Sequence, residues 1–176
     1  MIGSLRYLCN SRPDICYSVS VISKFMHDPR KSHLIAAKRI LKYIKGTMEY
    51  GLLFHNGSRS EGNELIGYSD SDWYGGLTDR RSTSGYVFNF NDAAISWCTK
   101  KQLVIALSSC KDEYDAGNFA TFQDLWLDSV MKELKCEIVK PLTLRIDNKY
   151  IISLAKNSIS HGRSKHIETR FHFTRE

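Results

Sequence analysis

The chain contains no run of about 18 or more apolar residues, the length that a helix needs to cross a membrane. Its first residues, 1–6, lack the basic and then apolar layout of a secretion signal. We therefore expect an intracellular protein, cytoplasmic or nuclear, that is not secreted and does not use a membrane.

A paired Cys-x-x-Cys motif is also absent. The five cysteines are scattered along the sequence, at Cys9, Cys16, Cys98, Cys110 and Cys136. Such spacing is typical of reduced, mostly buried thiols in an intracellular protein. Near the end of the chain, spacings of five and six residues keep three histidines off a common helical face: His161, His166 and His172. We therefore expect no zinc site.

Acidic residues are scarce at both ends of the chain, and the net charge of +6 comes from these ends. Residues 1–50 hold nine Lys and Arg against three acids, and residues 140–176 hold eight against three. Residues 51–139 reverse the balance, with eight basic residues against thirteen acidic ones. A run of charge often marks only a solvated face, but an acidic centre between basic flanks also suits a nuclease that grips phosphates and cuts with metal.

At 176 residues, 42% of them apolar, the chain can form one ordinary domain, or one domain and a fragment. One clear linker, residues 55–63, is made of polar and turn-forming residues. Before it, the apolar spacing predicts helices over residues 10–27 and 32–46, followed by a short strand over residues 50–54. We therefore place a domain boundary at the linker.

Beyond the linker, the alternation of apolar residues and the turn residues predict three strands, a long helix, a fourth strand and a second helix. They cover residues 64–73, 85–90, 93–98, 110–135, 142–147 and 148–157. A strand that follows a crossover helix in the same sheet runs parallel to its neighbour. The order therefore predicts an α/β fold with a mixed sheet, in which an antiparallel meander of three strands is joined by a parallel strand, with helices against it.

Three carboxylates fall at the ends of these elements. Asp70 ends the first strand, Glu113 opens the long helix on its core-facing stripe, and Asp147 ends the fourth strand. A lone Asp after a strand is most often part of a surface turn, but an unpaired charge on a core-facing stripe is costly. Carboxylate oxygens are the ligands that hard divalent cations prefer, so the three together predict a cation site. Asp72 is a further candidate ligand, for which we favour a structural role.

Many short segments also resemble one family in a single order. They are residues 68–73, 80–86, 95–97, 107–110, 112–114, 147–149 and 161–167. These segments resemble the ribonuclease H region of copia-type retrotransposon Pol polyproteins. The segments 3–8, 12–15 and 43–47 resemble the end of the reverse transcriptase that precedes it. The resemblance covers nearly the whole chain.

The resemblance implies a ribonuclease H-like domain over residues 64–176 and the helical, basic C-terminal end of a reverse transcriptase over residues 1–54. It implies cleavage of the RNA strand of an RNA–DNA hybrid, beside the reverse transcriptase of the same Pol polyprotein. Two Mg²⁺ or Mn²⁺ ions would be held by Asp70, Glu113 and Asp147, with Asp70 between them. Basic residues expected to contact the hybrid are Arg81, Lys100, Lys101, Arg163 and Lys165, of which Lys100 and Lys101 are expected in a turn.

Two departures from the family pattern leave an alternative open. The residue before the helix Glu is usually Ala in the family and is Asp112 here, which either weakens the metal geometry or does nothing. The family's chain continues past the position of Glu176 into a last strand and a helix with a fourth Asp, so we expect a C-terminally truncated domain. The alternative is therefore a relic with weak or no catalysis that at most binds nucleic acid.

Overall fold

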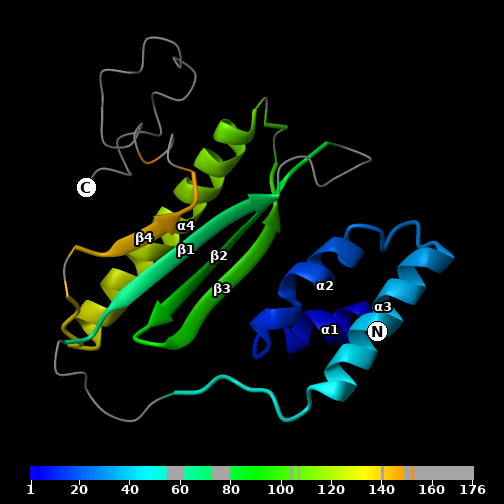
Figure 1. Ribbon diagram of the computed structural model, residues 1–176, viewed down its shortest axis with the longest axis horizontal. Helices are drawn as coiled ribbons and strands as arrows, with labels where there is room; N and C mark the ends of the chain where they lie inside the picture. The colour runs from blue at the N-terminus through cyan, green and yellow to red at the C-terminus, as the bar shows by residue number, and fades with distance from the viewer. Residues whose placement is uncertain are drawn as a thin grey trace. The chain divides into compact units, whose positions relative to one another are not determined.

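The computed structural model describes residues 1–54, 62–72, 80–103, 105–106, 108–139, 141–148 and 152. The chain divides into two compact units, Met1–His55 and Asn56–Glu176, each with a hydrophobic core of its own. Helices form the first unit, and the described part of the second unit contains a four-stranded sheet with a long helix (Figure 1). Within the described ranges, no helix is long and apolar enough to span a membrane.

The first unit contains the helix α1 (Ile2–Leu8), the short 3₁₀ helix η1 (Pro13–Ile15), and the helices α2 (Cys16–Ser23) and α3 (Lys31–Gly46). Pro13 occupies the start of η1, where the N–H that proline lacks would have no helical partner. The buried core of this unit comes from all four elements: Leu5, Ile15, Val19, Ile22, Ala37 and Ile40.

Two predictions for this unit are wrong, and one helix was missed. The helix predicted over 10–27 is confined to η1 and α2, because Arg12 leaves the helical conformation at φ −128° and ψ 82°. The helix α1 was not predicted, although its apolar residues at spacings of three pack on the common core. The strand predicted over 50–54 does not form, and Leu53 and Phe54 are exposed.

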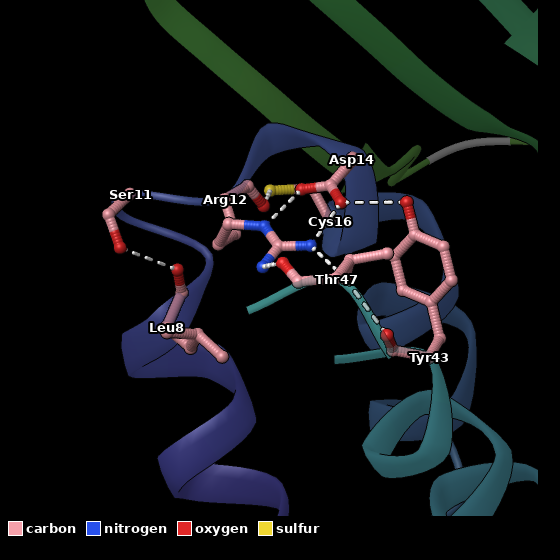
Figure 2. Close-up of polar contacts among 7 residues, drawn as sticks. All are labelled: Leu8, Ser11, Arg12, Asp14, Cys16, Tyr43 and Thr47. Atoms are coloured by element: carbon pink, nitrogen blue, oxygen red, sulfur yellow. Dashed lines mark hydrogen bonds and ion pairs between the residues drawn. The ribbon is translucent and has the colours of Figure 1, made fainter. Parts of the chain in front are cut away.

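A hydrogen-bonded network around Arg12 joins the turn before α2 to the end of α3 (Figure 2). The Arg12 guanidinium donates to both carboxylate oxygens of Asp14 at 2.9 and 2.7 Å. It also donates to the backbone oxygen and the hydroxyl oxygen of Thr47 at 3.0 and 2.7 Å. The Tyr43 hydroxyl donates to Asp14 at 3.0 Å. Asp14 of η1 therefore accepts from Arg12, which precedes η1, and from Tyr43 of α3, and it links this turn to α3.

We expect Asp14→Asn to destabilise the first unit at pH 7 and to have no effect in strong acid. The hydrogen bond from Arg12, with a smaller effect from Tyr43, holds the pKa of Asp14 below its ordinary value, against the opposing effect of burial. The stabilisation is therefore fully present above the pKa of an unfolded Asp, about 3.9, and is lost as the pH falls through the lower folded pKa.

Hydrogen exchange of the α2 and α3 amides, followed by mass spectrometry on the full chain, measures this effect. The variant should exchange faster than the unsubstituted chain at pH 7, and the difference should shrink steadily as the pH falls below about 3.9. Asp28→Asn, at an exposed position between α2 and α3, is the matched control and should not change the rate. A difference for Asp14→Asn that does not shrink with falling pH would contradict the role of the charged carboxylate.

The second unit is built on a sheet with the strand order β3-β2-β1-β4. β1 (Leu65–Asp72) pairs antiparallel with β2 (Thr83–Phe90), which pairs antiparallel with β3 (Ala93–Lys101). β4 (Thr143–Ile146) pairs parallel with β1, so Ser69 lies opposite Ile146. The predicted mixed sheet is confirmed, and it is consistent with a ribonuclease H-like fold.

The long helix α4 (Ser109–Glu133) lies along one face of this sheet (Figure 1). Ser108 caps it by accepting a hydrogen bond from the N–H of Lys111 at 3.2 Å. The core between helix and sheet joins Ala120 and Leu127 of α4 to Leu65 and Phe88. This packing fixes where the first turn of α4 meets the ends of the strands.

Candidate functional site

The three predicted carboxylates lie on elements that meet at one end of the sheet. Asp70 is exposed near the end of β1, and Asp147 is exposed directly after β4. Because β1 and β4 are parallel neighbours, with Ser69 opposite Ile146, their C-terminal ends lie side by side. Glu113 is half-buried near the start of α4.

The charges of Asp70 and Asp147 affect the pKa of Glu113. Burial raises the pKa of Glu113, a hydrogen bond with Asn148 lowers it, and the charges of Asp147 and Asp70 raise it further. Its buried Oε2 atom has no hydrogen-bond partner among the residues that the structure describes. A divalent cation offsets the repulsion between neighbouring carboxylates, and it can be coordinated by carboxylate oxygens that have no hydrogen-bond donor. The three carboxylates are therefore chemically suitable ligands for Mg²⁺ or Mn²⁺.

The side chains of the three carboxylates do not converge on a common point where an ion could bind. In the described part of the chain, no three His, Cys, Asp or Glu side chains are close enough to hold a metal ion. Asp70 instead accepts a hydrogen bond from the N–H of Ser71 at 2.8 Å. Because Asp70 and Asp147 are exposed, their side chains can rotate with little loss of packing. The fold therefore places the three carboxylates near enough for their charges to interact. Their side chains would have to rotate before all three could coordinate one ligand.

Asp72, the further candidate ligand, takes part in the pairing of β1 with β2. Its Oδ1 atom accepts a hydrogen bond from the N–H of Thr83 at 2.6 Å, and Thr83 is its partner in the strand register. This contact favours the structural role over that of a ligand.

Three of the predicted hybrid-binding residues lie at the same end of the sheet as Asp70. Arg81 is exposed just before β2, and Lys101 lies opposite Thr83 in the β2–β3 pair. The prediction of a turn at Lys100 and Lys101 is wrong, because β3 continues to Lys101 as the partner of β2. Two further predicted residues, Arg163 and Lys165, lie outside the described residues, as do the three histidines considered for zinc.

A pocket beside Lys100 was missed from the sequence. It has a volume of about 180 Å³ and is lined by Ser84, Lys100, Lys101, Gln102, Leu103, Asp115 and Phe119. The Lys100 ammonium group lies 5.7 Å from the centre of the Phe119 ring. An aromatic ring beside a basic group suits contact with nucleic acid. No local pattern indicated the pocket, because its walls come from β2, from the end of β3 and the residues after it, and from α4.

Asp112 is buried to a degree that the sequence analysis did not anticipate. Its side chain has 0% exposure, and burial raises its pKa, against the lowering effects of Ser71, Ser82 and Gln102. Position 112 is four residues before the buried Ala116, but this spacing alone did not distinguish Asp112 from its neighbour Glu113, because the residues around Asp112 come from outside the helix.

The sequence matches known proteins over almost its whole length. It is 38% identical over 99% of its length to the retrovirus-related Pol polyprotein from transposon RE1 of Arabidopsis thaliana. It is 39% identical over 99% of its length to the corresponding polyprotein from transposon TNT 1-94 of Nicotiana tabacum. The chain spans only 12% and 13% of the length of these two relatives. No protein-family model matches, and no solved structure matches.

A third relative is a short protein. Secreted RxLR effector protein 161 of Plasmopara viticola is 46% identical over 72% of this chain, and the match covers 87% of that protein. The expected relation to retrotransposon Pol polyproteins is confirmed by the two longer relatives. The chain therefore belongs to the same family as secreted RxLR effector protein 161, and over almost its whole length it is homologous to a segment of the retrovirus-related Pol polyproteins of plant transposons.

Proposed function

We propose that the second unit is a ribonuclease H-type domain that hydrolyses the RNA strand of an RNA–DNA hybrid. The observation that supports this most is that the elements carrying Glu113, Asp147 and Asp70 meet at one end of the sheet, where the charges of Asp147 and Asp70 raise the pKa of Glu113. The first unit is then the C-terminal end of a reverse transcriptase in the same intracellular Pol polyprotein. The homology to Pol polyproteins supports this assignment.

Asp70, Glu113 and Asp147 are the residues that would hold two Mg²⁺ or Mn²⁺ ions, with Asp70 shared between them. When bound, such ions make a water molecule more acidic and offset the charge on the leaving oxygen. The chain itself supplies the positions of the donors. Asp70 and Asp147 lie at strand ends, and Asn148, which directly follows Asp147, forms a hydrogen bond with Glu113. Because two of the carboxylates are exposed, a large duplex can reach them.

The basic residues at this end of the sheet would contact the phosphates of the hybrid. Arg81, Lys100 and Lys101 surround the strand ends, and Arg163 and Lys165 are proposed for the same role from the sequence resemblance. Contacts to phosphates fix the position of a duplex without reading its sequence. This suits an enzyme that must place any hybrid beside its carboxylates.

A second function, binding of nucleic acid without cleavage, is favoured by one observation. As the described side chains lie, no three of the candidate ligand types are close enough to hold an ion. If Asp70 and Asp147 did not rotate toward Glu113, the basic residues would still attract phosphates, because this attraction depends on charge alone.

Cleavage of a labelled RNA–DNA hybrid by the full chain, with Mg²⁺ or Mn²⁺, distinguishes the two functions. We expect slow, metal-dependent cleavage of the RNA strand, because the carboxylates must rotate before the site is complete. Asp70→Asn should lower the rate on the order of 100-fold or more, since a metal-bound group contributes several kcal/mol to the transition state.

Asp92→Asn is the matched control for this experiment. It also removes one carboxylate from the second unit, but in the β2–β3 turn, at the opposite end of the sheet from Asp70. It should cleave as fast as the unsubstituted chain. Cleavage that survives Asp70→Asn would contradict the proposed site, and binding of the hybrid without any cleavage would support the second function.

A further inference from the structure

The solvent-exposed side of α3 in the first unit carries cations and no acid. From Lys31 to Gly46 the helix contains no Asp or Glu. All of its Lys and Arg residues are exposed: Lys31, Lys38, Arg39, Lys42 and Lys45. In the described part of the chain, none of these five side chains forms an ion pair. We call these five residues the basic face of α3.

The spacing of the four lysines in the basic face places them on one side of the helix. Steps of seven, four and three residues separate them, and each step is close to one or two turns of about 3.6 residues. The opposite side of α3 holds Ala37, Ile40 and Ile44, which pack in the core of the first unit. From Lys31 to Lys45 the helix rises about 21 Å, at about 1.5 Å per residue. The cations therefore form a ridge on a rigid element, directed away from the core.

The stability of α3 does not explain this concentration of positive charge. Lys38 lies one helical turn from Lys42, and Lys42 lies one turn from Lys45. Like charges at these spacings are neighbours on the helix surface and destabilise the helix. Lys31 also lies in the first turn, where the helix dipole favours a negative charge. A ligand of opposite charge would offset these unfavourable interactions.

We propose that the basic face of α3 binds the phosphate backbone of a nucleic-acid duplex. A duplex carries about one phosphate charge for each 1.7 Å of its axis, so several phosphates come within reach of a ridge of this length. Contacts of this kind hold a duplex without reading its sequence. The basic face belongs to the first unit, whereas the candidate cation site belongs to the second. Binding at α3 therefore does not depend on cleavage by the second unit.

An anionic membrane surface is the alternative ligand for a basic helix. Helices that lie on a membrane bury a continuous apolar face in the lipid and keep their cations on the other face. In α3, the continuous apolar face packs in the core of the protein. Leu34 and Leu41 are exposed, but Lys38 lies between them along the helix. This arrangement favours phosphates on the outside of a duplex over the interior of a lipid layer.

The test is the affinity of the full chain for a fluorescein-labelled RNA–DNA hybrid, measured by fluorescence anisotropy at a series of salt concentrations. EDTA is present, so that no divalent ion supports cleavage. The logarithm of the affinity should fall with the logarithm of the salt concentration, with a slope of about 0.9 for each phosphate contact. For the triple variant Lys38→Gln, Lys42→Gln and Lys45→Gln, we expect this slope to decrease by about 2 to 3. Its affinity should be lower about 10-fold or more near 50 mM salt.

Two matched variants separate the position of the charges from their number. The triple variant Arg6→Gln, Lys132→Gln and Lys135→Gln removes the same net charge from exposed positions outside α3. It should change the slope by less than about 1. A variant with Lys→Arg at the three α3 positions keeps the charges of the basic face and should bind the hybrid as the unsubstituted chain does.

Several outcomes would overturn binding of a duplex by the basic face. Equal changes of slope in the α3 variant and in the control outside α3 would show that only net charge matters. Loss of binding in the Lys→Arg variant, or no binding of the hybrid by the unsubstituted chain, would also overturn it. If the Lys→Gln variant kept its affinity for the hybrid but lost binding to vesicles of phosphatidylserine and phosphatidylcholine, the basic face would serve a membrane surface instead.

Failure of this inference and failure of the proposed function are distinguishable. An unsubstituted chain that binds the hybrid through α3 but does not cleave it with Mg²⁺ or Mn²⁺ would contradict the proposed function alone. Cleavage that Asp70→Asn abolishes, together with an unchanged slope in the α3 variant, would contradict only the role of the basic face.

Discussion

Phe88→Ala is expected to destabilise the second unit by about 3–5 kcal/mol, the range found when a large buried aromatic side chain is removed. Phe88 is fully buried in β2, where it contacts Leu65 and the α4 residues Ala120 and Leu127. Its ring also meets the Tyr86 ring nearly edge-on, with the ring centres 5.5 Å apart. Alanine would leave a cavity between a sheet and a helix that cannot collapse to fill it.

Urea unfolding followed by tryptophan fluorescence measures this loss. All three tryptophans, Trp73, Trp97 and Trp126, belong to the second unit, so the signal reports on that unit alone. Phe122→Ala removes the same atoms from an exposed position on α4, and we expect it to change stability by no more than about 0.5 kcal/mol. Equal losses for the two variants would show that Phe88 does not occupy the core.

Gly67→Ala is expected to destabilise the second unit by about 1–3 kcal/mol, although alanine usually suits a strand better than glycine does. A Cβ atom at position 67 would lie 2.5 Å from Cε1 of Phe88 and 2.8 Å from Cδ1 of Leu144. Both contacts are far shorter than carbon atoms tolerate. The ring or the strand would therefore have to shift within a close-packed core.

Gly85→Ala is the matched control for this change. A Cβ atom there would meet its nearest neighbour, the backbone oxygen of Cys98, at an ordinary 3.6 Å. It should leave the urea midpoint unchanged or raise it slightly. Phe88→Leu in the Gly67→Ala background should recover part of the loss, because a smaller side chain frees the space that Cβ needs. Equal shifts for Gly67→Ala and Gly85→Ala would show that the crowding at position 67 is not real.

The sheet of the second unit could be predicted because its causes are local. Alternation along β1 and β2 assigns the strands, and the crossover through α4 requires β4 to run parallel to β1. For the strand predicted over 50–54, the sequence indicated no neighbouring strand with which it could pair. An apolar run becomes a strand only where another strand offers its backbone groups, and the described first unit consists of helices.

The candidate site could be predicted only as far as its backbone positions. The placement of Asp70, Glu113 and Asp147 at element ends follows from the pattern of the sequence, but the directions of their side chains follow from contacts such as the one between Asp70 and the Ser71 N–H. Adjacent helix positions can also both turn inward. The burial of Asp112 beside Glu113 depends on side chains from three strands, and periodicity along one helix does not contain that information.

The parallel pairing of β4 with β1 fixes the order in which the chain can complete its structure during synthesis. In the first unit, the Arg12 network spans no further than Thr47, so its contacts are available early. Ile66 finds its partner Thr143 only after all of α4 has been made, and pairs so distant in sequence form slowly because of the loop that must be closed. Asp147 therefore reaches the neighbourhood of Asp70 and Glu113 in a late folding step. A nascent chain that has already formed its hairpin and long helix still lacks the third carboxylate, so the three proposed ligands come together only when the last strand of the described sheet has docked.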